Sequence, residues 1–215
     1  MKFMKLILIL ATCLIAALSL GQGRGMFRNG QMGQPGSLLG RTDVQTDLAL
    51  TADQKAKIDA INTDYRGQMR EIFQNANGDF AAARKQMAPL MEKQQAEQMK
   101  VLTADQVTRL TQISIQLWSY GALLSKDLQT QLGLSDSEKA KIESLNQAMQ
   151  DANASVFQKA QNNEIDRSEI GPTMQKNSDA LKASIGGVLT DAEKAKFTSM
   201  AGKTFTPDPP PSGGR

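Results

Sequence analysis

The chain has no histidine, and Cys13 is the only cysteine among its 215 residues. The commonest general base and metal ligand of proteins is therefore missing. Aromatic residues make up 5% of the chain, so a folded core must rely on Leu, Ile, Met and Ala, which suits helix packing better than a sheet. No glycine-rich phosphate loop follows a strand pattern. The sequence predicts a protein that is not an enzyme and has no cofactor.

A strong charge of one sign is also missing. Lys and Arg number 25 against 22 Asp and Glu, which gives a net charge of +3. At this near balance a few residues set the isoelectric point of about 9.0, and the chain has no basic cluster. We therefore predict no nucleic-acid partner.

Residues 1–21 have the pattern of a signal peptide. Lys2 and Lys5 precede an apolar run at residues 6–20 that is too short to span a bilayer, and small residues follow. Cleavage after Ser19 or after Gly21 would fit this pattern. We expect the chain to be exported to the periplasm or secreted, with no membrane insertion after the signal is removed.

Two alternatives for this segment are an uncleaved membrane anchor and lipid attachment at Cys13. The polar, glycine-rich stretch that follows the apolar run argues against an anchor. Thr12 precedes Cys13 where a smaller residue is expected, and the apolar run continues past the cysteine, which argues against lipidation. A mature chain without Cys13 would have no disulfide, thiol nucleophile or thiolate metal site.

The composition changes again after the signal and near the end of the chain. Residues 22–42 are rich in Gly and Gln and predict a flexible linker, and residues 206–215, which contain TPDPPPSGG, predict a disordered or extended tail. Between them, apolar residues recur at steps of three and four without a convincing strand pattern. The predicted fold class is all-α, built from antiparallel amphipathic helices.

A helix-starting phrase occurs four times between these segments. Each copy is a capping box. The Thr or Ser hydroxyl accepts a hydrogen bond from the backbone N–H of the third helical residue, and the Gln or Glu side chain at that position accepts one from the backbone N–H of the Thr or Ser. A leucine precedes every cap. The copies consist of Leu50, Thr51 and Gln54; Leu102, Thr103 and Gln106; Leu134, Ser135 and Glu138; and Leu189, Thr190 and Glu193.

The spacing of the four copies indicates an internal duplication. Leu50 and Leu102 are 52 residues apart, Leu134 and Leu189 are 55 apart, and the second pair starts 84 residues after the first. We therefore predict two tandem helical-hairpin repeats, at residues 43–126 and 127–205.

The boxes resemble those of the LTxxQ-motif family of exported helical proteins, the Spy/CpxP-like proteins of the periplasm. The match is complete at residues 50–54 and 102–106, whereas the second half has Ser135, Glu138 and Glu193 at the motif positions. Chaperone members of this family are cradle-shaped helical dimers that hold unfolding clients on a concave surface without ATP. Because this chain is duplicated and its boxes are closer together, the resemblance implies either a monomer that acts as a pseudo-dimer or a homodimer.

The resemblance implies an ATP-independent periplasmic chaperone or stress-response protein whose partners are unfolded or envelope proteins. A regulatory or scaffold module of the cell envelope is the alternative. A periplasmic metal sensor is a third interpretation, but the metal sites of such relatives rely on histidine. Met26 and Met32, or Met87 and Met91, could offer sulfur to Cu(I), but core packing is the better explanation, because methionine commonly fills gaps between helices. We predict no metal site.

Trp118 and Tyr120 are candidate client-binding residues, because they follow the third apolar stripe and could anchor a partner if exposed. Aromatic residues near helix ends are usually packed, so the alternative is that they lock this helix onto the hairpin.

Overall fold

The computed structural model describes residues 32–76 and 80–208, and the predicted signal peptide lies outside them. All regular structure in the described residues is helical, which confirms the all-α fold class. None of these helices is both long enough and apolar enough to cross a bilayer. In chain order the elements are the 3-10 helix η2 (Pro35–Gly40), α1 (Thr42–Asp47), α2 (Ala52–Asn75), α3 (Phe80–Val101), α4 (Ala104–Trp118), the 3-10 helix η3 (Ser119–Leu124), α5 (Lys126–Leu132), α6 (Asp136–Gln161), α7 (Arg167–Val188) and α8 (Asp191–Ser199).

The same order of elements occurs twice. Each half has a 3-10 helix, a short helix, two long helices and a closing helix, from η2 to α4 and from η3 to α8. Pro35 and Ser119, which begin η2 and η3, are 84 residues apart, the spacing that also separates Leu50 from Leu134. The predicted boundary between residues 126 and 127 falls at the start of α5. The repeated order of elements starts the second half earlier, at Ser119. The sequence interpretation did not find this start because η2 and η3 have no capping box.

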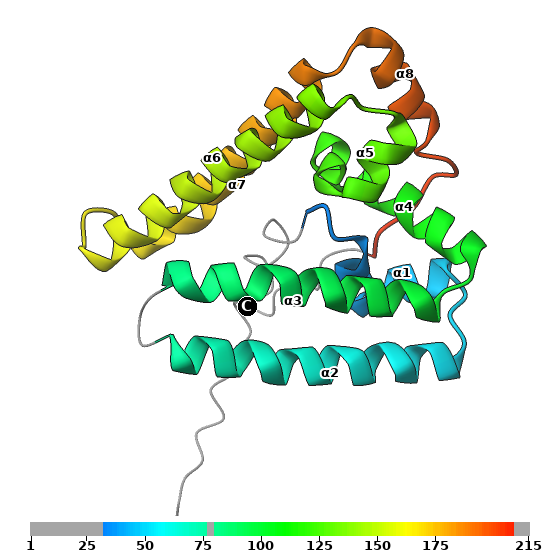
Figure 1. Ribbon diagram of the computed structural model, residues 1–215, viewed down its shortest axis with the longest axis horizontal. Coiled ribbons are helices and arrows are strands. Elements are labelled where there is room, and N and C mark those ends of the chain that lie inside the picture. The colour runs from blue at the N-terminus through cyan, green and yellow to red at the C-terminus, as the bar shows by residue number, and fades with distance from the viewer. Residues whose placement is uncertain (1–31, 77–79, 209–215) are drawn as a thin grey trace, which may run out of the picture.

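In Figure 1 the two long hairpins, α2–α3 and α6–α7, are farthest apart where α4 and α5 lie between them, and in this view they approach each other toward their far ends. Ile58 of α2 and Ile142 of α6 are fully buried, and both belong to one hydrophobic cluster with residues of the short helices and of α4 and α7. A second, smaller cluster around Val156 and Ile170 lies between α6 and α7. One core therefore joins the halves at the base of the hairpins.

The prediction of a linker at residues 22–42 is wrong for its described part. Met32, Leu38 and Leu39 are buried in the shared core, and residues 35–40 form η2. The Ser178 hydroxyl of α7 donates to the Met32 sulfur at 3.8 Å. The apolar residues of this segment are few and are separated by glycines, so they form no helical or strand periodicity in the sequence. Met32, Leu38 and Leu39 are nevertheless buried in the core. Residues 22–31 lie outside the described residues.

The predicted tail is partly ordered as well. The Asp208 N–H donates to the Asp43 carboxylate at 3.0 Å, and just before the predicted tail the Phe205 N–H donates to Gln116 Oε1 at 2.7 Å. Residues 206–208 have no regular secondary structure, as the extended alternative predicts, but they are held at α1 and are not disordered. Residues 209–215 lie outside the described part.

The Asp43 carboxylate makes this attachment dependent on pH. The hydrogen bond from the Arg41 side chain holds the pKa of Asp43 at about 2, helped by the backbone N–H groups of Asp208 and Val44. Since this folded-state pKa is depressed, the stabilisation is present above the unfolded pKa and is lost as the pH falls through the folded one. Asp43→Asn is expected to lower the free energy of unfolding near neutral pH by about 1 kcal/mol, after allowance for solvent screening.

Urea denaturation of wild type and Asp43→Asn at several pH values measures this. We expect the difference between the two proteins to shrink as the pH falls from about 4 toward 2. A difference that stays constant across this range would show that the Asp43 charge contributes nothing.

Ala49 and Gly133 occupy equivalent places before the capping leucines, and both have positive φ, 48° and 88°. This conformation lets the Leu50 N–H reach the Gln45 carbonyl at 3.0 Å, as the Leu134 N–H reaches that of Gln129. The left-handed backbone conformation is sterically unfavourable for a residue that has a Cβ, whereas glycine adopts it readily. We expect Ala49→Gly to raise the free energy of unfolding by about 0.5 kcal/mol in chemical denaturation, and a loss of stability would contradict this.

Candidate interaction surface

All four predicted capping boxes are formed. In each box, the hydroxyl of the N-cap residue accepts a hydrogen bond from the backbone N–H of the third helical residue. The Gln or Glu side chain at that third position accepts a hydrogen bond from the backbone N–H of the N-cap residue. A fifth box, with Asp166 as the cap and Glu169 at the third position, begins α7. The sequence interpretation missed it because this cap is an aspartate and no leucine precedes it.

The glutamines of the first two boxes also bind each other. Gln54 Nε2 donates to Gln106 Oε1 at 2.7 Å, and Gln106 Nε2 donates back to Gln54 Oε1 at 3.2 Å. The same two amide groups donate to the carbonyls of Val101 at 3.0 Å and Leu48 at 3.1 Å. The phrase therefore caps two helices and also ties the start of α2 to the start of α4.

The second half has carboxylates at the equivalent places. The Glu138 pKa is lowered by hydrogen bonds from the side chain and backbone of Ser135, with a smaller contribution from Glu193, so the two glutamates are within hydrogen-bonding reach. A carboxylate accepts hydrogen bonds and cannot donate. Here Lys196 Nζ donates to the Leu132 carbonyl at 2.9 Å, whereas Gln106 donates to the equivalent Leu48 carbonyl.

Glu193→Gln tests this difference between the halves. The new amide keeps the cap, as Gln106 does, and adds a donor for the Glu138 carboxylate, so we expect a higher melting temperature near neutral pH. Glu164→Gln, an exposed glutamate in the turn between α6 and α7, is the matched control for removing one negative charge. Equal melting temperatures of the two variants would contradict the proposed pairing.

The two aromatic residues singled out in the sequence are packed. Trp118 is 7% exposed and belongs to the shared core. Tyr120 is half-buried, with its ring centroid 5.2 Å from that of Phe197. It also lies against Gly186, where an added Cβ would come within 2.7 Å of the tyrosine ring. The packing alternative therefore describes both residues.

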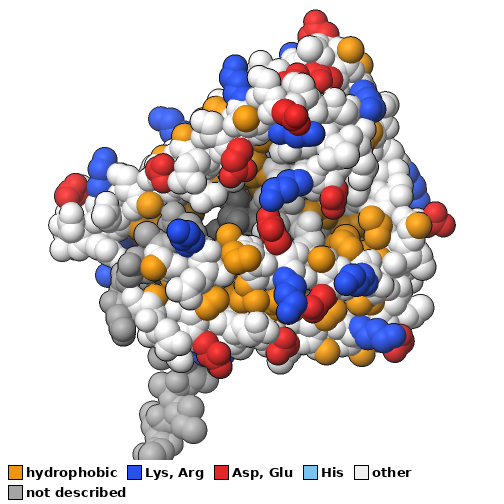
Figure 2. All heavy atoms as spheres, viewed as in Figure 1, with side chains coloured by type: hydrophobic (Ala, Val, Ile, Leu, Met, Phe, Trp, Pro, Cys, Tyr) orange, Lys and Arg blue, Asp and Glu red, His pale blue; other side chains and the backbone are white. Residues whose placement is uncertain are grey.

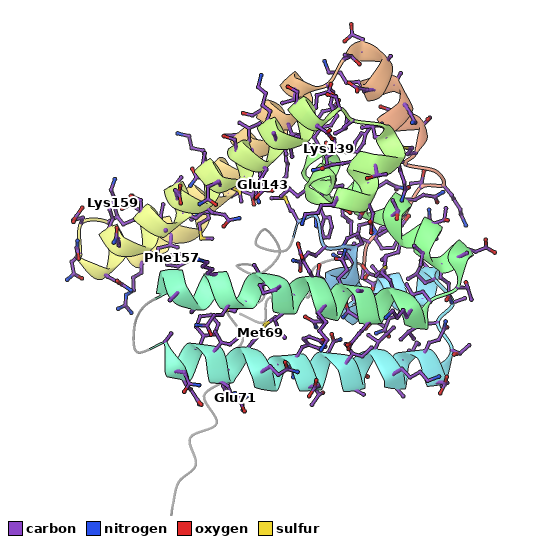
Figure 3. All side chains as sticks on the ribbon, viewed as in Figure 1. Met69, Glu71, Lys139, Glu143, Phe157 and Lys159 are labelled. Carbon is purple, nitrogen blue, oxygen red and sulfur yellow. The ribbon has the colours of Figure 1, made fainter. Side chains whose placement is uncertain are left out.

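Phe73 and Phe157 are the exposed large hydrophobic residues of the described part, at 49% and 41%. They are 84 residues apart, so they occupy the same place on α2 and α6, toward the far end of each hairpin. In Figure 3 the Phe157 side chain points from α6 to the side on which the α2–α3 hairpin lies. We call this pair the phenylalanine pair. The sequence interpretation missed it, although the duplication spacing would have shown that the two positions match.

The surrounding surface mixes charges of both signs with apolar side chains. Figure 2 shows Lys and Arg scattered among Asp and Glu, with hydrophobic side chains between them over α3 and between α2 and α3. Met87, Leu90 and Met91 of α3 are half-buried. Such a surface suits partners that contribute apolar groups and carry no strong charge of one sign.

The methionines considered for copper lie in separate parts of the chain, with Met87 and Met91 one turn apart on α3. Met32 is buried in the core, Met87 and Met91 lie on α3, and Met26 is outside the described residues. Within residues 32–76 and 80–208, no group of three or more acidic, histidine or cysteine side chains is placed to hold a metal ion.

No protein-family model, curated protein or solved structure matches the chain. The interpretation of the surface therefore depends on its own residues and on the resemblance of its capping boxes.

Proposed function

We propose that the chain is an exported, ATP-independent periplasmic chaperone or stress-response protein of the Spy/CpxP kind, which binds unfolding proteins on its helical surface. The main observation that supports this proposal is the exposure of the phenylalanine pair. Two large apolar side chains at matching positions of the two repeats leave 41% or more of their surface in water, where most large apolar side chains are covered. They are suited to contacts with apolar segments that an unfolding protein exposes.

The arrangement of the hairpins supports two contacts with one client. Phe73 and Phe157 lie on different hairpins that share one core at their base. A client segment long enough to reach from one hairpin to the other can contact both phenylalanines, so two weak contacts act together at a raised effective concentration. Each contact by itself is weak enough to release the client without ATP.

A regulatory or scaffold module of the cell envelope is the alternative function. The formed capping boxes fit either function, because they fix helix starts and say nothing about the partner. A regulatory module would bind one folded partner tightly, whereas a chaperone binds many unfolded ones weakly.

The deciding experiment is an aggregation assay with the mature chain. A chaperone reduces the light scattering of several chemically unfolded clients at near-stoichiometric ratios without ATP. Failure with every client, together with one tight partner in a pull-down, would overturn the proposal in favour of the regulatory module. Size-exclusion chromatography with light scattering, run on the same sample, decides between the proposed pseudo-dimeric monomer and a homodimer.

A further inference from the structure

The last described residues of the chain form an extended segment that is bound to α4 and α1. In Figure 1 this segment runs from α8 back past α4 toward α1. Residues 204–208 have no regular secondary structure. One side chain of the segment, that of Phe205, is buried, with 7% of its surface exposed. We call residues 201–208 the tail segment.

Two side chains of α4 hold the backbone of the tail segment. Gln116 Nε2 donates to the carbonyl oxygens of Ala201 at 2.6 Å and Lys203 at 2.8 Å. Gln116 Oε1 accepts from the Phe205 N–H at 2.7 Å. Arg109 Nη1 donates to the Lys203 carbonyl at 2.5 Å. Gln116 therefore binds carbonyl and N–H groups of the segment at once, as a neighbouring strand would.

Helix α1 contributes two carboxylates to this arrangement. The Asp43 carboxylate accepts from the Asp208 N–H at 3.0 Å. The two Asp47 oxygens accept from Arg109 Nε at 2.6 Å and from its Nη2 at 2.9 Å. This paired contact fixes the plane of the guanidinium, so its other nitrogen already points at the backbone of the segment. The tail site, as we call it, consists of Asp43, Arg109, Gln116 and the core position that the Phe205 ring fills.

The other large side chains of the tail segment contribute little to its binding. Exposed side chains are those of Lys203, Thr204, Thr206, Pro207 and Asp208. The segment is therefore held by its main chain and by one aromatic anchor, which is how recognition sites for extended peptides work. Such a site accepts many sequences, provided that an aromatic side chain stands at the anchor position.

The duplicated fold forms without the arginine–aspartate pair of this site. The capping leucines before α4 and α8 are 87 positions apart, so Arg109 corresponds to Lys196, which donates to the Leu132 carbonyl. By the 84-residue spacing, Asp47 corresponds to the exposed Gln131. Helix α8 thus closes the second half without such a pair. The pair in the first half is explained better by the segment that it holds than by the fold.

We propose that the tail site is a peptide-binding site that takes an extended segment of another protein with an aromatic residue at the anchor position. The chain's own tail segment occupies the site as an autoinhibitory ligand, which the partner segment displaces. Because the tail is tethered, it competes at a high effective concentration. Unfolding clients expose such segments, so the identity of the partner rests on the proposed function, whereas the site itself does not involve the phenylalanine pair.

Peptide binding to the full mature chain tests the site. Phe205→Ala weakens the hold on the chain's own tail and leaves α1 and α4 unchanged. The probe is a fluorescent peptide with the sequence of residues 200–208, and its anisotropy reports binding. We expect saturable binding to the Phe205→Ala chain and roughly tenfold weaker binding to wild type, whose own tail competes. A probe with alanine in place of its phenylalanine should also bind roughly tenfold more weakly.

Two outcomes of this titration would overturn the proposal. They are the absence of saturable binding to the Phe205→Ala chain and equal binding of the two probes. The titration needs no unfolding client, so its failure is distinguishable from a failure of the aggregation assay.

A second substitution in the Phe205→Ala chain locates the binding. Arg109→Gln should weaken binding of the probe roughly tenfold, because a charged hydrogen bond to the peptide carbonyl is lost. Arg70→Gln, at an exposed position of α2, is the matched control and should leave binding unchanged. Equal binding by the two double variants would contradict recognition at the tail site.

Hydrogen exchange of wild type decides if Phe205→Ala fails to fold. A displaceable tail opens without unfolding of the core, so the Phe205 amide should be roughly tenfold or more less protected than that of Leu110, which is buried in α4. Equal protection would overturn the proposal, because the tail would then leave only when the chain unfolds. A wild-type dimer that Phe205→Ala abolishes would also overturn it, since the tail would then bind a second copy.

Discussion

Replacing both Phe73 and Phe157 with serine is expected to remove most of the chain's suppression of aggregation while lowering its melting temperature much less than the loss of two core phenylalanines would. The two side chains are 49% and 41% exposed, so the fold loses about half of the buried apolar area that two core phenylalanines would contribute. Burying the exposed half of one phenylalanine against a client contributes about 1 kcal/mol, which corresponds to roughly fivefold in affinity for each residue. Light scattering of a chemically unfolded client at near-stoichiometric ratios measures the effect.

Exposed glutamines next to the two phenylalanines provide the control. The double variant Gln74→Ser with Gln158→Ser changes exposed residues directly after the two phenylalanines, on the same helices. It should leave the suppression of aggregation intact. Each single phenylalanine variant should lose a comparable part of the activity, because the two positions are equivalent. Full suppression by the double phenylalanine variant would show that clients bind elsewhere.

Gly33→Ala is expected to lower the free energy of unfolding by about 3 kcal/mol. Gly33 has φ of 84°, which disfavours any residue with a Cβ. An added Cβ would also lie 2.4 Å from the Leu124 Cβ and 2.6 Å from the Leu124 carbonyl carbon, so the backbone of η3 would have to move. Urea denaturation at fixed pH gives the difference between variant and wild type.

Gly40→Ala is the matched control for this substitution. No atom lies within 4 Å of the added Cβ, and Gly40 is exposed at the end of η2. Its effect should stay within about 0.5 kcal/mol. If both variants are equally stable, residues 32–40 are not packed into the core as described.

The helix starts could be predicted from the sequence because capping is local. Thr51 and Gln54 are three residues apart, and both hydrogen bonds of their box form within one turn of helix. The same reasoning applied to the three other predicted boxes, and all are formed. The pairing of Gln54 with Gln106 joins residues 52 positions apart, and no local pattern specifies it.

Burial was harder to predict where it depends on contacts between distant segments. The glycine-rich composition around Met32 predicted a linker, but the sulfur fits against Ser178 of α7 and the nearby glycines permit close approach. Trp118 lies at the end of an apolar stripe, so the sequence alone left its exposure open. Its place in the core depends on the helices of both halves.

The candidate surface could have been found by aligning the two halves. A shift of 84 positions places Phe157 on Phe73, but periodicity alone treats both as ordinary members of a helix. Exposure distinguishes them, and exposure follows from which faces of α2 and α6 remain uncovered. The same alignment shows where the halves differ, as at Gln98 and Ile185.

Site-specific photo-crosslinking to an unfolding client tests the central claim most directly. A photoreactive phenylalanine analogue is placed at position 157, and in a parallel sample at the exposed position 158 of the same helix. The proposed function predicts strong crosslinks to several unfolded clients from position 157, few from position 158, and none to the same clients when they are folded. Equal crosslinking from the two positions, or none from position 157, would contradict binding of clients at the phenylalanine pair.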